Sequence, residues 1–229
     1  MLSKFLFCIL LFFFLTISSV KSKIGFDCKS ISKCQSLAGY VSPNATTLSE
    51  IATLFKVTDI NYFLGANSLP IGTSLTKSVA AMETIRIPFA CSCKNGSGIA
   101  DDTTMYKVQA GDSLDHIARN IFSMLVTYQD IAEANGYIIH LHTDVAGQFL
   151  SIPIPCSCDN VDGIQVVHYA HVVSPNQTLE MIGKEFGVSG KTLLTLNHLG
   201  DARSLQYESV LDVPLRGWLL LVVHFIDSI

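Results

Sequence analysis

One pattern of about fifty residues occurs three times in this chain and constrains the fold more than any other feature. In the middle copy, Leu114, Ile117 and Ala118 have the spacing of one helix face. The same apolar set begins at Leu48, 66 residues earlier, and at Leu179, 65 residues later. Three copies account for most of the chain, which leaves no room in it for a separate catalytic domain.

The middle copy predicts the order strand, helix, helix, strand. Residues 106–109 alternate as a short strand does, and 110–113 supply turn residues with Ser113 as a candidate N-cap. A first helix follows over 114–121. A second helix around 128–134 stops at Asn135-Gly136, which is a C-terminal cap signature, and 149–153 close the unit as a strand.

The other two copies follow the same order. In the first, from about residue 39 to 89, Tyr40-Val41 is the expected strand and Thr47 is a capping-box partner for Glu50. Its second helix ends at Asn67, and a long polar connection through Gly72, Thr73 and Ser78 is expected as a loop. In the third, from about 169 to 214, Val172-Val173 form the strand, Ser189 is an N-cap and Asn197 ends the second helix.

These motifs occur together in the middle copy: YKVQAGDSLDHIA, then EAN, then LSIPIP, with Cys-Ser-Cys after the first and middle copies. The combination resembles a LysM repeat. The layout is similar to that of plant LysM domain-containing receptor-like proteins, GPI-anchored or secreted, whose three-LysM ectodomains bind N-acetylglucosamine polymers. The resemblance implies an α+β fold with three tandem βααβ LysM modules packed into one block by disulfides.

The expected organisation has five parts. They are a signal peptide (1–23), an N-terminal Cys segment with a degenerate first LysM (24–90), a second LysM (105–154), a third LysM (168–215) and a divergent hydrophobic tail (216–229). The first part has a lysine before an uninterrupted apolar run of about eleven residues and small residues beyond it, as secretory signals do. A retained N-terminal anchor is the alternative. The tail is too short to span a bilayer and lacks the spacer of a GPI signal.

Cysteine use fits export. Cys8 would leave with the signal, so six cysteines remain, and an even number in an oxidising compartment indicates three disulfides. Two C-x-C pairs could also supply four thiolates to zinc, and this alternative stays open. Six cysteines allow fifteen pairings, among which the residues alone do not choose. The resemblance implies the pairs Cys28–Cys93, Cys34–Cys158 and Cys91–Cys156.

Three sequons predict N-glycosylation at Asn44, Asn95 and Asn176. Asn44 and Asn176 fall in the turn where a LysM module would contact sugar, in the first and third copies. A glycan there would crowd the groove, so the ligand site is expected in the middle copy, whose turn carries no sequon.

By resemblance, the glycan-binding residues come from two loops of the middle copy. The first loop contributes Gln109, Ala110, Gly111, Asp112 and Ser113, and the second contributes Asn135, Gly136, Tyr137, Ile138 and Ile139. Small residues let a sugar approach the backbone, whose amides match the N-acetyl group. The alternative for any one residue is a structural role, with Asn135-Gly136 acting only as a helix cap.

Other site classes are less well supported by the sequence. Asp101-Asp102, and Asp112 with Asp115, could suggest paired carboxylates, but neighbouring turn aspartates are usually solvated and two catalytic roles need two environments. His140 with His142, and His168 with His171, lack the spacing of a metal site. No basic stripe indicates nucleic acid. We therefore expect no enzyme activity, no cofactor and no metal.

The sequence thus predicts an extracellular pattern-recognition protein of the apoplast, whose full-length relatives are anchored at the outer face of the plasma membrane. Its expected ligands are chitin oligosaccharides, peptidoglycan or both. A LysM receptor kinase is the expected signalling partner in immunity or symbiosis, and a homodimer is a further candidate. The alternatives are a secreted lectin that masks or scavenges glycans, and an accessory module of a cell-wall hydrolase.

Overall fold

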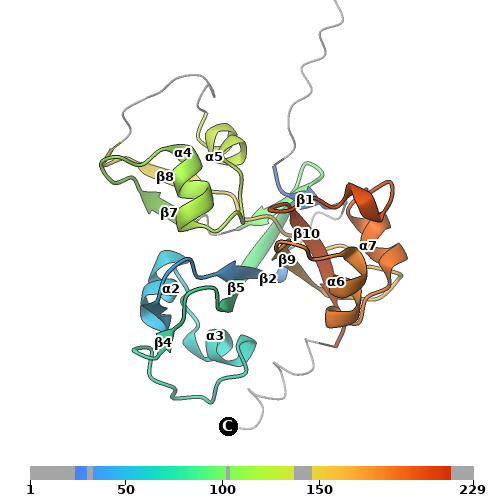
Figure 1. Cartoon of the computed structure of the whole chain (residues 1–229), viewed down its shortest axis with the longest axis horizontal. Coiled ribbons are helices and arrows are strands. Elements are labelled where there is room, and N and C mark those ends of the chain that lie inside the picture. Colours follow the sequence, from blue (N-terminus) through green and yellow to red (C-terminus); the bar gives the residue numbers. More distant parts are fainter. Residues whose placement is uncertain (1–23, 30–32, 102–103, 137–145, 218–229) are drawn as a thin grey trace, which may run out of the picture.

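Each of the three repeats folds as strand, helix, helix, strand in the computed structural model, which describes residues 24–29, 33–101, 104–136 and 146–217 (Figure 1). Module 1 contains β2 (Lys33–Val41), α2 (Leu48–Leu54), α3 (Ile60–Ala66) and β5 (Thr84–Lys94). Module 2 contains β7 (Thr104–Lys107), α4 (Leu114–His116), η1 (Ile117–Ile121), α5 (Tyr128–Ala134) and β8 (Phe149–Ile152). Module 3 contains β9 (Val167–Val172), α6 (Leu179–Phe186), α7 (Gly190–Leu196) and β10 (Val210–Leu215). The α+β class and the order of elements are therefore confirmed.

Local capping signals place the helices as the sequence predicted. The Thr47 side chain accepts from the Glu50 amide while the Glu50 carboxylate accepts from the Thr47 amide, which is a complete capping box. Ser113 and Ser189 cap α4 and α7 through the amides three residues on. The 3-10 turn η2 (Ala202–Ser204) lies in the loop before β10. No helix within the described ranges has the length and apolar character needed to cross a membrane.

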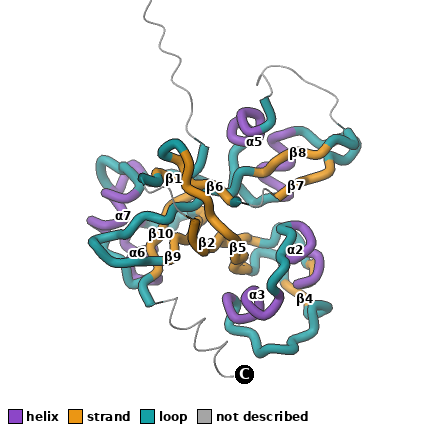
Figure 2. The backbone as a smooth tube through the Cα atoms, turned by 180° about the vertical axis from the view of Figure 1, so that it is seen from behind, coloured by secondary structure: helices purple, strands orange, loops and turns teal. Residues whose placement is uncertain are grey.

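Modules 1 and 3 share one sheet, whereas module 2 keeps its own. The six-stranded sheet has the order β1-β6-β5-β2-β9-β10, with the short strands β1 (Phe26–Asp27) and β6 (Ser97–Ala100) at one edge. Strands β2 and β9 are parallel and pair only through Leu37 with Tyr169 and Ala38 with Ala170. Gly39 is required beside this contact, because a Cβ there would overlap the Tyr169 phenol. Figure 2 shows these strands passing between the two modules, with β7 and β8 apart.

Strands β2 and β9 are longer than the sequence predicted, because their upstream residues pair with β5 and β10 of their own modules and, at two positions, with each other. The first strand was expected at Tyr40-Val41 and the third-module strand at Val172-Val173, but β2 begins at Lys33 and β9 at Val167. These upstream residues find partners in β5 and in each other. Pairing between segments 130 residues apart has no local signature in the sequence.

Modules 1 and 2 pack into one hydrophobic core through aromatic side chains. Tyr40 meets Phe55 at 5.0 Å between ring centroids, Phe55 meets Phe122 at 5.7 Å, and Phe122 meets Tyr106 at 5.9 Å, all edge to face. Such pairs each contribute roughly 0.5–1.5 kcal/mol beyond the area they bury. Module 3 has a separate core around Ile182, whose members come mainly from β9, α6 and β10.

The first helix of module 2 differs from the continuous α-helix predicted over 114–121. After three α-helical residues it continues as the π-helix η1, and Ser123 and Met124 then adopt positive φ of 49° and 63°. The segment from Leu114 to the next cap, Thr127, is two residues longer than its counterpart from Leu48 to Asp59. The wider helix accommodates the extra residues. It also brings the Ser123 hydroxyl to the Val41 carbonyl at 2.5 Å, which joins modules 2 and 1.

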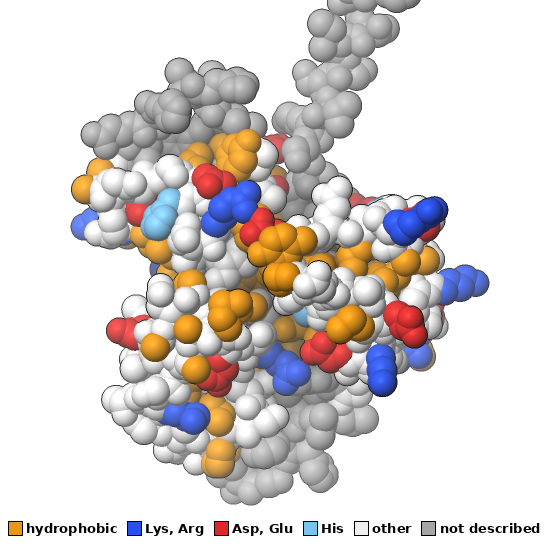
Figure 3. Space-filling view, viewed as in Figure 1, with side chains coloured by type: hydrophobic (Ala, Val, Ile, Leu, Met, Phe, Trp, Pro, Cys, Tyr) orange, Lys and Arg blue, Asp and Glu red, His pale blue; other side chains and the backbone are white. Residues whose placement is uncertain are grey.

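The surface carries mixed charge. Lys and Arg side chains are scattered among Asp and Glu over the face in Figure 3, and hydrophobic side chains gather near its middle, where the modules meet. The ion pair between Arg119 of module 2 and Glu208 of module 3, at 2.5 Å, spans one of these junctions. A surface without a field of one sign fits a neutral ligand better than a polyanion.

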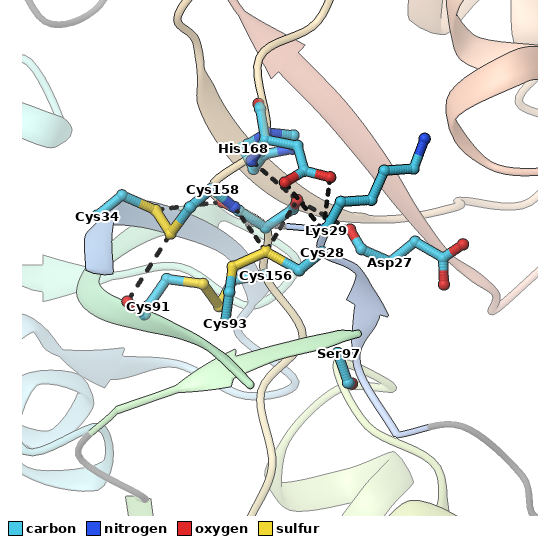
Figure 4. The surroundings of a disulfide bond; sticks show 12 residues. Asp27, Cys28, Lys29, Cys34, Cys91, Cys93, Ser97, Cys156, Cys158 and His168 are labelled. Carbon is cyan, nitrogen blue, oxygen red and sulfur yellow. Dashed lines mark hydrogen bonds between the residues drawn. A yellow bond between two sulfur atoms is a disulfide. The ribbon is translucent and has the colours of Figure 1, made fainter. Parts of the chain in front are cut away.

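Three disulfides join the segments between the modules (Figure 4). The pairs are Cys28–Cys93, Cys34–Cys158 and Cys91–Cys156, the same pairs that the resemblance implied, with Cα separations of 5.6, 5.7 and 6.0 Å. They tie the N-terminal segment, β2 and β5 to the linker before module 3. All six sulfurs are used in these bonds, so they are not available as the thiolates of the zinc site considered from the sequence.

A buried histidine connects module 3 to the disulfide region. His168 Nδ1 lies 2.8 Å from Asp212 in β10, its Nε2 lies 2.8 Å from the Asp159 carbonyl, and both side chains are almost fully buried. The Asp159 carboxylate in turn accepts from the Lys29 amide at 2.9 Å. His168 was considered with His171 as a ligand pair, but it bonds to a carboxylate instead. Burial lowers the pKa of His168, yet the hydrogen bond and charge of Asp212 outweigh it, so that the pKa lies above its usual range.

Replacing Cys34 and Cys158 together by Ser should lower the free energy of unfolding by about 2–5 kcal/mol, because this bond closes a 124-residue separation. Urea denaturation followed by circular dichroism measures the loss. Gln35→Ser, an exposed change on the same strand, is the control and should stay within about 0.5 kcal/mol of wild type. An unchanged midpoint in the double Ser variant would contradict this role for the bond.

The His168–Asp212 pair predicts a pH-dependent stability. Because the folded-state pKa of His168 is raised, its contribution is fully present below the ordinary value of about 6.5 and is lost as pH rises through the raised pKa. The comparison is a His168→Asn, Asp212→Asn double variant, which keeps polar groups but titrates neither. Urea denaturation is measured at pH values from below about 6.5 to above the raised pKa of His168. The free energy of unfolding of wild type, relative to that of the variant, should fall as pH rises. A constant difference would exclude the charged pair.

Candidate functional site

Two side chains of the first loop of module 2, Asp112 and Ser113, fix the conformation of its backbone. The Asp112 carboxylate accepts from the Gln109 amide at 2.8 Å and from the Tyr106 hydroxyl at 2.9 Å. Burial and the adjacent Asp112 raise the pKa of Tyr106 to about 12, so the phenol keeps the proton that it donates. Ser113 is used as the helix cap through the His116 amide at 3.0 Å. Asp112 and Ser113 therefore shape the loop.

The top of this loop faces solvent. Gln109, Ala110 and Gly111 are exposed, and Gly111 has a φ of 91°, a left-handed conformation that favours glycine. Nothing lies within 4 Å of where a Gly111 Cβ would be. The Gln109 amide and carbonyl are both bonded to Asp112, so the backbone that this turn leaves open to a ligand is that of Ala110 and Gly111.

Asn135 of the second loop has a structural role. Its amide nitrogen donates to the carbonyls of Ile131 and Ser151 at 2.7 and 2.9 Å, and its oxygen accepts from the Ser151 amide at 2.9 Å. Asn67 and Asn197 make the same three bonds in modules 1 and 3. Each asparagine holds the end of its second helix to the closing strand. These bonds support the interpretation of Asn135 as a helix cap. An asparagine ends the second helix in all three repeats, and this recurrence is the sequence signal that indicates a structural role.

The remaining second-loop candidates are only partly described. Gly136 is exposed with a φ of 69°, which completes the helix end. Tyr137, Ile138 and Ile139 lie outside the described residues, as do His140 and His142.

Backbone pairing brings the two loops together. The Val108 amide donates to the Gln148 carbonyl at 2.9 Å, and the Gly147 amide donates to the Val108 carbonyl at 2.8 Å. The first loop therefore starts directly beside the end of the second. Phe149 follows there, and 61% of it is exposed although it is a large aromatic residue.

Phe149 was expected only as part of the closing strand. Leu150 and Ile152 are buried, so the alternation of the strand turns Phe149 and Ser151 to the opposite side. An aromatic ring on the outward side of a strand, next to a small-residue turn, is suited to stacking on a sugar ring. This alternation is readable in the sequence and would have added Phe149 to the candidates.

Module 1 closes the corresponding groove with its own chain. Its two loops pair as strands, β3 (Thr46–Thr47) with β4 (Ser78–Val79), and the Ser49 amide donates to the Leu75 carbonyl at 2.8 Å. Ser78 was predicted in an unstructured connection, and this was wrong because the long loop folds back onto the first turn. A ligand could reach this groove only by displacing the pairing.

The acidic side chains considered as catalytic pairs have structural partners. Asp101 pairs with Lys33 at 2.5 Å and Asp115 with Arg119 at 2.9 Å, both at the surface, while Asp112 supports the loop. Asp102 lies outside the described residues. The carboxylates considered from the sequence, as far as they are described, therefore have structural partners.

Comparisons with known proteins agree with this architecture. The family described as LysM domain matches residues 106–153 and 171–214, which fall on modules 2 and 3. LysM domain-containing GPI-anchored protein 2 of Arabidopsis thaliana is 43% identical over 206 residues, 90% of this chain and 58% of that protein. Chitin elicitor-binding protein of Oryza sativa subsp. japonica is 44% identical over 182 residues, 80% of this chain and 51% of that protein.

A solved structure shows the same fold. The crystal structure of the ectodomain of a receptor like kinase superposes with a TM-score of 0.66 at 20% identity, covering 84% of this chain and 96% of that one. The chain spans a little over half the length of the two sequence relatives. With three βααβ modules, their junction disulfides and these matches together, the chain belongs to the plant family of LysM domain-containing proteins.

Proposed function

We propose that this protein is an extracellular receptor component that binds N-acetylglucosamine-containing glycans, chitin oligosaccharides or peptidoglycan fragments, in the groove of module 2. The rice relative is named for binding a chitin elicitor, and the Arabidopsis relative for its GPI anchor. The first name supports glycan binding, and the second supports a site at the outer face of the plasma membrane. Binding without catalysis also fits Asp101, Asp112 and Asp115, which serve as a loop support and in surface ion pairs.

The observation that carries the proposal is the exposed turn Ala110–Gly111, whose first strand pairs through Val108 with the backbone just before the exposed Phe149. Each N-acetyl group offers one amide donor and one carbonyl acceptor, which match exposed backbone groups of the turn. The flat face of a sugar ring is apolar at its C–H groups and fits an aromatic surface. A shallow site of this kind suits a neutral polymer that adds contacts with each further sugar.

Module 2 is favoured over its neighbours by two observations. The groove of module 1 is closed by β3 and β4, and the turns of modules 1 and 3 carry the exposed sequon residues Asn44 and Asn176. A glycan at either position would stand in the path of a ligand. The turn of module 2 has no sequon and carries alanine and glycine instead.

Titration calorimetry of the secreted protein with a chitin octamer and with a soluble peptidoglycan fragment tests the site. Ala110→Trp should weaken binding at least about tenfold, or about 1.4 kcal/mol, because the indole would cover the turn. Ala110 suits this better than Gly111, since its φ is negative and no backbone strain confuses the result.

Pro175→Trp is the matched control, because Pro175 holds the same exposed position in the turn of module 3. It should bind as wild type does. If Ala110→Trp and Pro175→Trp weaken glycan binding equally, the binding site does not lie in module 2. Absence of heat with both glycans, in protein whose folding is verified by circular dichroism, would overturn glycan binding altogether.

Signalling requires a partner with a kinase, and the fold shared with a receptor kinase ectodomain supports a related protein in that role. We expect the chitin octamer to promote co-purification of the full-length, epitope-tagged protein with a LysM receptor kinase, and Ala110→Trp to abolish that dependence. Glycan binding without such co-purification would instead favour a masking lectin.

A further inference from the structure

A cavity of about 320 Å³ lies between modules 1 and 2, away from the groove described above. Asn44 and Leu54 line it from module 1, and Asn120 and Ile121 line it from η1 of module 2. Its volume is at the lower end of the range of about 300–1,000 Å³ for small-ligand sites. Asn44 is exposed at its edge and is the acceptor of the sequon Asn44-Ala45-Thr46.

The backbone that carries Asn44 is firmly held. The buried Ser42 hydroxyl donates to the Asn44 carbonyl at 2.7 Å, and the Ser42 carbonyl accepts from the Met82 amide at 2.7 Å. On the other side, the Thr46 hydroxyl donates to the Glu50 carboxylate at 2.5 Å. A group attached to Asn44 would therefore start from a fixed position at the mouth of the cavity.

The walls offer the chemistry of an N-acetylated sugar. Leu54 and Ile121 are partly exposed aliphatic side chains that suit the acetyl methyl and the C–H face of the ring. The exposed Asn120 amide makes no protein hydrogen bond among the described residues, so it can both donate to and accept from the acetamide. Glu50, also in the lining, can accept from a sugar hydroxyl.

We propose that the first N-acetylglucosamine of a glycan on Asn44 occupies this cavity and braces module 1 against module 2. The inference rests on the proposed extracellular function, because N-glycosylation takes place during export. Attachment joins Asn44 Nδ2 to the anomeric carbon of the sugar. The nitrogen loses a proton, and the pyrophosphate of a lipid-linked oligosaccharide donor is the leaving group.

At this location a sugar would strengthen the contact between modules 1 and 2. Module 2 reaches module 1 just after the π-helix, where the Ser123 hydroxyl donates to the Val41 carbonyl, and through the Phe55–Phe122 contact. A sugar held between Asn44 and Asn120 would close the solvent-exposed side of that joint. The same glycan keeps the already paired groove of module 1 covered.

The test uses the full secreted protein with one sequon retained at a time, the others being changed from Asn to Gln. An endoglycosidase that cleaves between the two core sugars leaves a single N-acetylglucosamine. Amide hydrogen exchange of residues 117–124 then reports opening of the joint. With one sugar on Asn44, exchange should be about tenfold slower than in the protein that also carries Asn44→Gln. Asn120→Ala should remove most of that protection.

Asn176 supplies the control, because it lies in the corresponding turn of module 3. One sugar there should leave exchange of residues 117–124 unchanged. Equal exchange with and without the Asn44 sugar, or mass spectrometry showing Asn44 unmodified, would overturn the brace even if chitin still binds. Slowed exchange in a protein that gives no heat with chitin or peptidoglycan would support the brace while overturning the proposed function.

Discussion

The three disulfides at the module junctions are the constraint on which the arrangement depends. Strands β2 and β9 touch through only two residue pairs, and a unit of about fifty residues buries a thin core. Such modules would separate easily if hydrogen bonds alone joined them. Cys34–Cys158 links the start of β2 to the linker before module 3, and Cys91–Cys156 links β5 to the same linker. The shared sheet and the buried His168–Asp212 pair form within that restricted geometry.

The three modules share one scaffold and differ mainly in their loops. The asparagine that bridges the second helix to the closing strand is present in every module, so the βααβ scaffold is common. Module 1 has a long second loop that pairs with its first turn and fills its groove. Module 2 has an insertion that becomes a π-helix and a turn of small residues that stays open. Module 3 contributes the histidine that packs against the disulfide region. The three related units therefore differ in structure at the loops where the proposed ligand would bind.

This division bears on how specificity would arise. The open turn of module 2 presents backbone groups rather than charged side chains, and the single exposed ring of Phe149 adds an apolar surface. Such a site recognises the repeated acetamide of a polymer through shape and backbone hydrogen bonds.

Local patterns in the sequence determined the modules themselves. Apolar spacing, the caps at Thr47, Ser113 and Ser189, and the terminal asparagines act within a few residues, so the order strand, helix, helix, strand was predictable for each module. The six cysteines that follow the predicted signal peptide indicated three disulfides, and a resemblance was needed to pair them. Only the tertiary structure decided that β2 and β9 pair in parallel, that His168 meets Asp212, and that module 1 closes its own groove. These contacts join residues that are 30 to more than 130 positions apart, and each depends on packing that no local preference encodes.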